Sequence, residues 1–220
     1  LISPILANVY LHYVLDLWFE KCIKKQLYGE AYLVRFADDF LIMFQYERDA
    51  QRVYEAIIKR MELFGLELSK EKTRILPFGR YSASRETFDF LGFTHFNSKT
   101  RKGYYTMGHK ISRKKKKQFK SNLKKWVKEN RNTQFDEFMK ALNKKLTGSF
   151  NYYSLSGMIR EVRSLWIHSL YVTFKWLNRR SQRRSFKLER FYEIWNVRII
   201  HPYIHVDIWS GDKVIYNKNV

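Results

Sequence analysis

The chain has 220 residues, of which 45% are hydrophobic and 17% aromatic, so it can bury a sizeable core and does not have a disordered composition. Charged residues interrupt its apolar stretches well before the ~20 residues that a membrane-spanning helix needs, and no signal-peptide pattern opens it. The single cysteine, Cys22, excludes a disulfide framework and a cysteine-based zinc site within the chain, and it fits a reducing, cytoplasmic setting. Because the chain starts at Leu1 and not at Met, within a helix-like segment, we expect it to be a piece of a longer protein.

Positive charge is concentrated in one part of the chain. The net charge is +21, which indicates a polyanionic partner. Residues 1–100 hold 14 Lys and Arg against 13 Asp and Glu, whereas residues 101–200 hold 26 against 6. This distribution predicts a nearly neutral part for structure or chemistry, joined to a second part that binds phosphate groups.

The first 45 residues predict a helix followed by a hairpin. Ser3-Pro4 has the form of an N-cap with Pro in the first turn, and a helix should run from there to about Lys25. The apolar runs Tyr32–Phe36 and Phe40–Phe44 enclose Ala37-Asp38-Asp39, so we expect a buried hairpin with a polar tip. The apolar residues of the helix include Leu6, Val9, Tyr10, Tyr13, Leu17 and Phe19.

A helix and several short strands are expected next. Apolar residues at helical spacing from Ala50 to Phe64 predict a helix, with Gly65 as its C-cap. Short strands are expected at residues 66–68, 73–77 and 88–96 and, after a turn at 99–103, up to about Met107.

Helices dominate the remaining sequence. Ser112 should cap the first of them, and Gly148 should end the second. The expected helices lie at about residues 112–130, 135–148, 156–180 and 185–197, and a C-terminal hairpin is expected at 203–209 and 214–216. The fold class is therefore α+β, with a mixed half that holds an antiparallel sheet and packed helices, followed by a basic, all-helical half.

Asp38 and Asp39 are the residues of the first half with the clearest chemical meaning. Carboxylates beside an apolar sheet are costly unless they are hydrogen-bonded, paired or bound to metal. Carboxylate oxygens are ligands of hard divalent cations, so the pair can anchor the metal ions of two-metal phosphoryl transfer. Asp also favours tight turns, and the dipeptide alone is better explained as turn chemistry. The apolar strands on both sides favour the metal site.

Five segments of the chain resemble motifs of one protein family. RFADDF, at Arg35–Phe40, resembles the R-[YF]-A-D-D-F hairpin of group II intron reverse transcriptases. The others are SPILANVYL at 3–11, GLELSKEKT at 65–73, FLGF at 90–93, and LNKKLTGSFNYY at 142–153, which is followed by LNRRS at 177–181. They occur in the order of the family, and the resemblance extends to about residue 199.

The resemblance implies a partial right-hand polymerase palm followed by a helical thumb and maturase domain. The catalytic, metal-holding residues would be Asp38 and Asp39, as two of three aspartates that bind Mg²⁺ in a two-metal site. The third aspartate, a Gln-Gly pair and the fingers would belong to earlier motifs. Phe36 stands where the family more often has Tyr, and Ser149 where it often has Trp. The expected domains are the later palm at 1–98, a linker or hairpin at 99–112, the thumb and maturase region at 113–199, and a tail at 200–220.

The function implied is RNA-directed DNA polymerization by a group II intron protein that also assists splicing and retrohoming. Its partners would be intron RNA, an RNA template, a DNA primer or target, and dNTPs, in the bacterial cytoplasm with RNA or the nucleoid. Two alternatives stay open: an RNA-binding maturase without polymerase activity, and another bacterial reverse transcriptase such as a CRISPR-associated one. Without the third aspartate and the fingers, we expect these 220 residues alone to be inactive as a polymerase.

Several residues are expected to contact nucleic acid or nucleotide. By resemblance, Lys72 lies near the nucleic acid or nucleotide and Leu91 and Gly92 near the primer end, although Lys72 is as well explained as a solvent-facing lysine and Gly92 as a bulge. Trp176 can stack on a base or belong to the core. The complete set is Arg35, Lys72, Leu91, Gly92, Arg113, Lys114, Lys115, Lys116, Lys117, Lys120, Lys124, Arg179, Arg180, Arg183 and Arg184.

A possible metal site near the end of the chain is not favoured. His201, His205 and Asp207 would share one face of a strand. The sequence offers no evident fourth ligand, and surface histidines are common, so we interpret them as ordinary surface residues.

Overall fold

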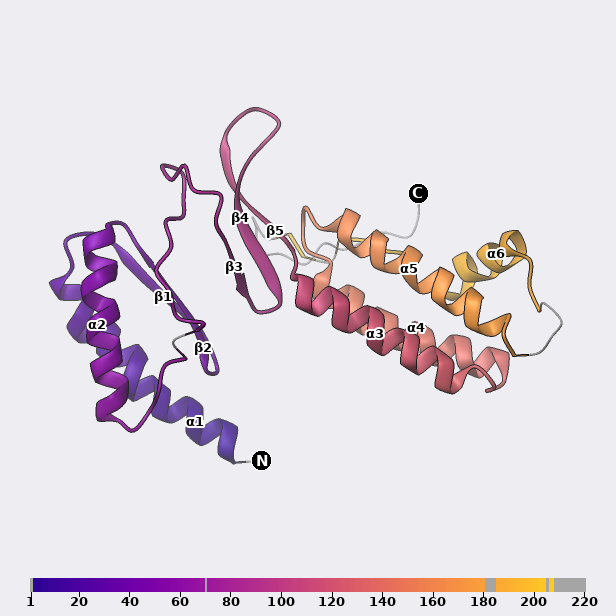
Figure 1. The fold of residues 1–220 in the computed structure, drawn as a ribbon, viewed down its shortest axis with the longest axis horizontal. Coiled ribbons are helices and arrows are strands. Elements are labelled where there is room, and N and C mark those ends of the chain that lie inside the picture. Colours follow the sequence, from indigo (N-terminus) through magenta and orange to yellow (C-terminus); the bar gives the residue numbers. More distant parts are fainter. Residues whose placement is uncertain (1, 70, 181–184, 205, 208–220) are drawn as a thin grey trace. The chain divides into compact units, whose positions relative to one another are not determined.

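The computed structural model describes residues 2–69, 71–180, 185–204 and 206–207. The chain divides into two compact units. The first unit comprises the residues up to Leu91 together with Phe96–Met107, and the second comprises Gly92–His95 and the chain from Gly108 onward. Helices and two small sheets make up the described part, which confirms the α+β fold class (Figure 1). No helix in these described ranges is both long enough and apolar enough to cross a membrane.

The first unit opens with one continuous helical path. Its elements are α1 (Ser3–Leu11), the π-helical turns η1 (His12–Asp16) and η2 (Phe19–Ile23), and the 3₁₀ turn η3 (Lys24–Gln26). The helix expected up to about Lys25 is confirmed. The expected N-cap is wrong, because Ser3 is the first helical residue and the N-cap position is Ile2, where no side chain caps the helix.

Only the later part of this path buries its apolar side chains. Val14, Leu15 and Phe19 are at most 1% exposed. A π-helical turn contains one extra residue, which rotates the following side chains relative to an ideal α-helix. Leu6, Val9 and Tyr13, which precede or enter the first π turn, are at least 50% exposed. The start of the path therefore presents an apolar surface, and its end belongs to the core.

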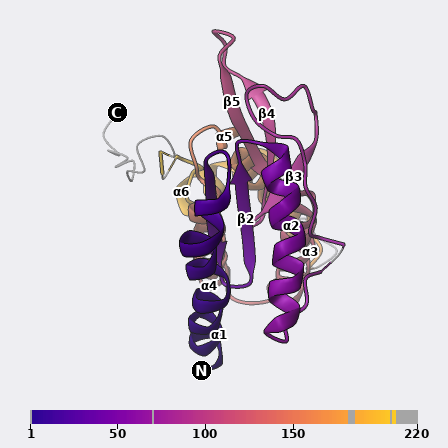
Figure 2. The ribbon, with the colours of Figure 1, turned by 90° about the vertical axis from the view of Figure 1, so that its left-hand side faces the viewer.

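The expected hairpin is confirmed. β1 (Ala31–Phe36) and β2 (Asp39–Phe44) pair antiparallel in a two-stranded sheet. One face of this sheet packs against the helical path and against α2 (Glu47–Leu63), which covers the expected helical segment (Figures 1 and 2). Val53, Ile57 and Met61 form the buried stripe of α2 at helical spacing.

The other face of the hairpin is exposed, so the expectation that the hairpin is buried is wrong for this face. Tyr32, Val34, Phe36 and Met43 project from that face and are between 44% and 64% exposed. Side chains alternate between the two faces of a strand, and the helices of the first unit cover only the face that carries Leu33.

The segment after α2 differs from the expectation. Residues 66–68 and 73–77 form no strand, so both strand predictions are wrong. The apolar spacing of these segments resembles that of strands, but a strand also requires a partner to bond with. The expected strand 88–96 is two strands, β3 (Thr87–Phe90) and β4 (Phe93–Lys99), separated by a turn in which Leu91 has φ 50° and Gly92 φ 82°. β5 (Tyr105–Ile111) completes a three-stranded sheet in the order β3-β4-β5.

The second unit is built mainly from helices. They are α3 (Arg113–Asn130), α4 (Phe135–Tyr153), α5 (Ile159–Leu177) and α6 (Leu188–Arg198), which confirms the existence of the expected helices. Their apolar stripes form one core that includes Leu123, Phe138, Leu165 and Trp195. α3 and α5 make the most extensive contact between helices of this unit (Figure 1).

Gly148 does not end the second helix of this unit, as expected, but lies inside α4. Leu142, Leu146, Phe150 and Tyr153 recur every three or four residues, and each is at most 9% exposed. Burial of the last two aromatic rings outweighs the ~1 kcal/mol that a glycine costs inside a helix. The C-terminal hairpin expected at 203–209 and 214–216 lies largely outside the described residues, and Val206 forms an isolated parallel bridge with Leu155.

Two neighbouring substitutions in α2 test which face of this helix is buried. Met61 is 3% exposed and Leu63 is 76% exposed. We expect Met61→Ala to lower the unfolding free energy by about 2–4 kcal/mol, because it leaves a cavity, and Leu63→Ala to change it by less than about 0.5 kcal/mol. Urea unfolding followed by circular dichroism measures both. Equal losses in the two variants would contradict the packing of α2.

Candidate active site and nucleic-acid surface

Asp38 and Asp39 lie at the tip of the β1–β2 hairpin. The register pairs Phe36 with Asp39, so Ala37 and Asp38 form a two-residue loop and Asp39 is the first residue of β2. Both carboxylates are exposed. Ala37 has φ 55°, a left-handed conformation that costs an L residue about 1–2 kcal/mol. A tight hairpin loop requires positive φ, and here a residue other than glycine supplies it, so neighbouring groups must stabilise the loop.

Arg35 supplies that stabilisation. Its Nε donates to Oδ1 of Asp16 and its Nη2 to Oδ2, each at 2.7 Å, in a bidentate ion pair. Its Nη1 donates to the side-chain oxygen of Asn8 and to the carbonyl oxygen of Ala37, each at 2.9 Å. The sequence placed Arg35 among the nucleic-acid contacts, whereas the structure uses its guanidinium to join α1, η1 and the hairpin loop.

The ion pair changes the protonation behaviour of both partners. The hydrogen bond from Arg35 holds the pKa of the Asp16 carboxyl below its ordinary value, although partial burial opposes this effect. The Asp16 carboxylate in turn raises the pKa of Arg35. Nδ1 of His12 also lies 3.3 Å from Oδ2 of Asp16, one helical turn away. The pair is therefore fully charged at neutral pH, with side chains that are 13% and 26% exposed for Arg35 and Asp16.

The carboxylates at the hairpin tip suit a hard divalent cation but do not complete a site. Within the described residues, no group of three or more His, Cys, Asp or Glu side chains is arranged to hold a metal ion. Asp38 and Asp39 would contribute carboxylate oxygens, the donor type that Mg²⁺ prefers, and further ligands would have to come from elsewhere.

The described residues of the disfavoured His201–His205–Asp207 site make contacts of another kind. His201 stacks on Trp166 with ring centroids 5.4 Å apart, and its Nε2 lies 3.0 Å from the carbonyl oxygen of Asn196. Asp207 accepts a hydrogen bond from the hydroxyl of Ser156. His205 lies outside the described residues.

The remaining candidates of the first unit occupy turns. Lys72 is exposed, and its backbone N–H donates to the carbonyl oxygen of Ser69 at 3.0 Å in a turn. Residues 66–69, which come shortly before it, form no strand, so the strand expected at 66–68 does not lead into Lys72. Leu91 lies in the turn between β3 and β4.

Gly92, which belongs to the second unit, lies against the start of α3. Its carbonyl oxygen accepts a hydrogen bond from the backbone N–H of Ser112 at 2.9 Å. A Cβ atom at Gly92 would lie 3.4 Å from Cγ of Lys115 and 3.8 Å from Oη of Tyr153. The positive φ of Gly92 and this close approach both favour glycine. Two residues that the sequence assigned separately to nucleic-acid contact, Gly92 and Lys115, are thus neighbours.

The start of α3 carries an unusual concentration of positive charge. Ser112 caps the helix by accepting a hydrogen bond from the N–H of Lys115, as expected. Five cationic residues, 113–117, follow with no acid in the first turn. Cations at a helix N-terminus are unfavourable because the helix dipole is positive there. Lys116 pairs with Glu161 at 3.1 Å, while Lys114 and Lys117 are exposed.

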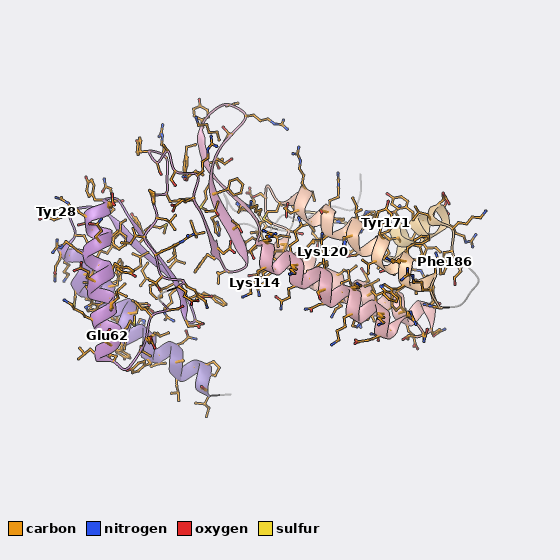
Figure 3. The ribbon with its side chains drawn as sticks, viewed as in Figure 1. Tyr28, Glu62, Lys114, Lys120, Tyr171 and Phe186 are labelled. Carbon is orange, nitrogen blue, oxygen red and sulfur yellow. The ribbon has the colours of Figure 1, made fainter. Side chains whose placement is uncertain are left out.

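This charge continues along α3 and into a groove beside it. Lys114 and Lys120 project from the first half of the helix (Figure 3), and Lys124 is exposed in its second half. An open groove between α3 and α4 is lined by Lys115 and Lys145. The amide side chains of Gln118 and Asn122 and the hydroxyl of Ser149 also line it. Cations and polar groups in one groove suit a phosphate backbone.

A second cationic cluster surrounds Trp176 at the end of α5. The cations of Lys128, Arg131 and Arg179 lie 5.8, 5.4 and 5.5 Å from the centre of its ring. Trp176 itself is half-buried and packs against the second core, as its core interpretation predicts. Burial lowers the pKa of Arg180. Arg183 and Arg184 lie outside the described residues.

Comparison with known proteins finds a similarity in the first part of the chain. Residues 1–95 match the family described as reverse transcriptase (RNA-dependent DNA polymerase). This segment is therefore similar to reverse transcriptases. A search of curated proteins found no match to the chain. The reverse transcriptase segment contains Asp38, Asp39, Arg35, Lys72 and the Leu91-Gly92 turn, whereas the basic residues from Arg113 onward lie outside it.

Sequence reasoning missed some residues that shape these sites. Asp16 and Asn8 hold Arg35, but no local spacing reveals contacts across 19 and 27 positions. Arg131 could have been added to the basic set, since it directly follows a lysine-rich helix. The sequence around Lys145 gives no indication, beyond the charge of the side chain, that this residue lines the groove.

The Asp16–Arg35 pair should make the first unit less stable in acid. Because the pKa of folded Asp16 lies below its ordinary 3.8, its contribution is complete above that value and is lost as pH falls through the lowered pKa. We expect the unfolding free energy to fall less steeply between about pH 5 and pH 2.5 in Asp16→Asn than in the wild type. Urea unfolding across this range measures the slopes. Glu20→Gln serves as the control, and a wild-type slope in Asp16→Asn would contradict the ion pair.

Proposed function

We propose that the chain is part of an RNA-directed DNA polymerase of the group II intron type. The observation that carries this proposal is the placement of Asp38 and Asp39 at the tip of a two-stranded hairpin inside the reverse transcriptase segment. The ordered motifs that resemble group II intron proteins support the finer assignment. Residues 1–98 would form the later palm, and residues 113–199 the thumb and maturase region.

Asp38 and Asp39 would hold Mg²⁺ at the growing end of a DNA strand. The metal would stabilise the negative charge that develops on the attacking and leaving oxygens during nucleotide transfer. The chain would contribute to this reaction by positioning the two carboxylates. The hairpin presents two adjacent carboxylates in a tight loop, and a rigid loop limits the conformational entropy lost when they bind a cation.

The helical unit would bind the nucleic acid that the polymerase copies and the intron RNA that it helps to fold. Residues 101–200 carry 26 of the 42 Lys and Arg of the chain. The groove between α3 and α4 and the cluster around Trp176 provide cations next to aromatic or amide groups, a combination that suits backbone phosphates and bases. Lys72, Leu91 and Gly92 would lie near the nucleotide and primer.

An RNA-binding maturase without polymerase activity is the second candidate. It is favoured by one observation: within the described residues the hairpin tip brings only two carboxylates together, whereas the cationic surface of the second unit is extensive. The two candidates differ in whether DNA is synthesised, and both require binding to RNA.

RNA binding should depend strongly on salt and on the start of α3. We expect the triple variant Lys114→Ala, Lys115→Ala and Lys117→Ala to reduce the slope of log affinity against log salt by about 2–3, because each phosphate contact contributes about 0.7–0.9. Lys116 is retained because it pairs with Glu161. Fluorescence anisotropy with a labelled RNA hairpin measures the slopes.

The matched control changes the exposed Lys21, Lys25 and Lys59 of the first unit to Ala. It removes the same net charge, so a slope that falls equally in both triple variants would show a general charge effect and no site at α3. An affinity that does not change with salt would contradict phosphate binding altogether.

Primer extension separates the two candidate functions. We expect negligible extension of oligo(dT) on poly(rA) by the 220-residue chain with Mg²⁺ and dTTP, because two carboxylates are too few for a two-metal site. A longer protein that includes the upstream motifs should extend the primer, and Asp38→Ala should abolish this extension. Robust, Asp38-dependent synthesis by the 220 residues alone would overturn the prediction, and a longer protein that binds RNA without synthesis would favour the maturase.

A further inference from the structure

One arginine side chain, that of Arg35, is hydrogen-bonded to the hairpin loop. The carbonyl oxygen of Ala37 accepts a hydrogen bond from Nη1 of Arg35 at 2.9 Å, and Ala37 is followed directly by Asp38. Ala37 adopts φ 55°, a conformation that favours glycine and therefore needs support from its surroundings. Among the described residues, Arg35 thus contacts the loop at the residue whose backbone is strained.

The same guanidinium is itself fixed by two other elements. Asp16 accepts from Nε and Nη2, and Asn8 accepts from Nη1 through its side-chain oxygen. The amide nitrogen of Asn8 donates to the carbonyl oxygen of Pro4 at 3.1 Å, which fixes the orientation of the amide. Four hydrogen bonds therefore restrain one side chain from three directions.

The position of Asp16 depends on the π-helical turn η1. Asp16 is the last residue of this turn, and its neighbours Val14 and Leu15 are buried in the first core. A π turn changes the direction in which the following side chains point. Buried neighbours on one side and a bidentate partner on the other leave the carboxylate little freedom.

We propose that Asp16, Arg35 and Asn8 form a clamp that positions the Asp38–Asp39 loop for metal binding. This proposal rests on the proposed function of the two aspartates as metal ligands. In the clamp, Asp16 aligns the guanidinium and Arg35 holds the carbonyl group of Ala37. The clamp residues touch neither metal nor substrate, so they are positioning residues.

The chemistry of arginine explains why lysine would not serve. A guanidinium is planar and can donate to a carboxylate through two N–H groups while a third group donates elsewhere. A lysine ammonium at position 35 would keep the charge, but it could not bind both oxygens of Asp16 in parallel and reach the Ala37 carbonyl in the same geometry. Arg35→Lys therefore separates the charge of the clamp from its geometry.

The alternative is that the ion pair only stabilises the first unit. Asp16 and Arg35 join the helical path to the hairpin, and breaking a half-buried pair lowers stability whatever happens at the loop. The two roles differ in one measurable respect. A purely structural pair affects the unfolding temperature, whereas a positioning pair also affects cation affinity in the fully folded protein.

The test uses Mn²⁺, a paramagnetic ion that replaces Mg²⁺, and the 220-residue chain. Mn²⁺ broadens the amide NMR signals of nearby residues, so titration reports an apparent Kd at the hairpin tip, residues 36–40. We expect Asp16→Asn and Arg35→Lys each to raise this Kd about fivefold at a temperature where both are folded, since part of a charge-assisted hydrogen bond is lost. Glu20→Gln is the control: its carboxylate pairs with Lys24 on the same helical path and should leave the Kd within twofold.

The outcomes separate the clamp from the metal site. Wild-type protein whose tip signals are not broadened more than those of Asp38→Asn would reject the proposed metal site itself. Selective broadening in the wild type with an unchanged Kd in folded Asp16→Asn or Arg35→Lys would overturn the clamp, even if their unfolding temperatures fall. If Asp16→Asn does not fold, Arg35→Lys decides alone, because it keeps the positive charge opposite Asp16.

Discussion

A bidentate ion pair between Arg35 and Asp16 joins the parts of the first unit that matter for the candidate active site. The hairpin alone is a two-stranded sheet, which is marginally stable in water. Its inner face gains stability from the core, but its loop lies beyond the reach of that core. The guanidinium extends the restraint from the helical path to the loop. Without the Arg35 guanidinium, the core would still hold the two strands. No other described side chain would then restrain Ala37 in a comparable way.

The second unit depends on a different balance of forces. Its helices pack through regular apolar stripes, so stability and charge are carried by different faces of the same elements. On α3, the Ser112 cap and the buried Leu123 and Val127 hold a helix whose first turn is electrostatically unfavourable. A bound polyanion would remove this disadvantage. Structure and ligand binding can thus oppose each other on one helix without preventing folding.

Features that depend on local spacing could be predicted from the sequence, and those that depend on distant partners could not. The stripe of α2 and the cap of α3 follow from residues within a few positions of one another. The prediction of strands at 66–68 and 73–77 was wrong because a strand needs a partner strand, which the local sequence does not reveal. The tip position of Asp38 and Asp39 was predictable from their apolar flanks, whereas the contacts of Arg35 depend on how α1 and η1 fold back on the hairpin.

The exposed apolar face of the hairpin has a consequence for handling the protein. Tyr32, Val34, Phe36 and Met43 lie on a short sheet, where apolar surface and strand edges favour self-association. At low ionic strength the net charge of +21 keeps molecules apart by mutual repulsion. Salt screens this repulsion and also weakens contacts to phosphate. A high-salt wash that removes nucleic acid from the protein should therefore also bring it closer to precipitation, and the colloidal stability of the free protein should be greatest in dilute buffer.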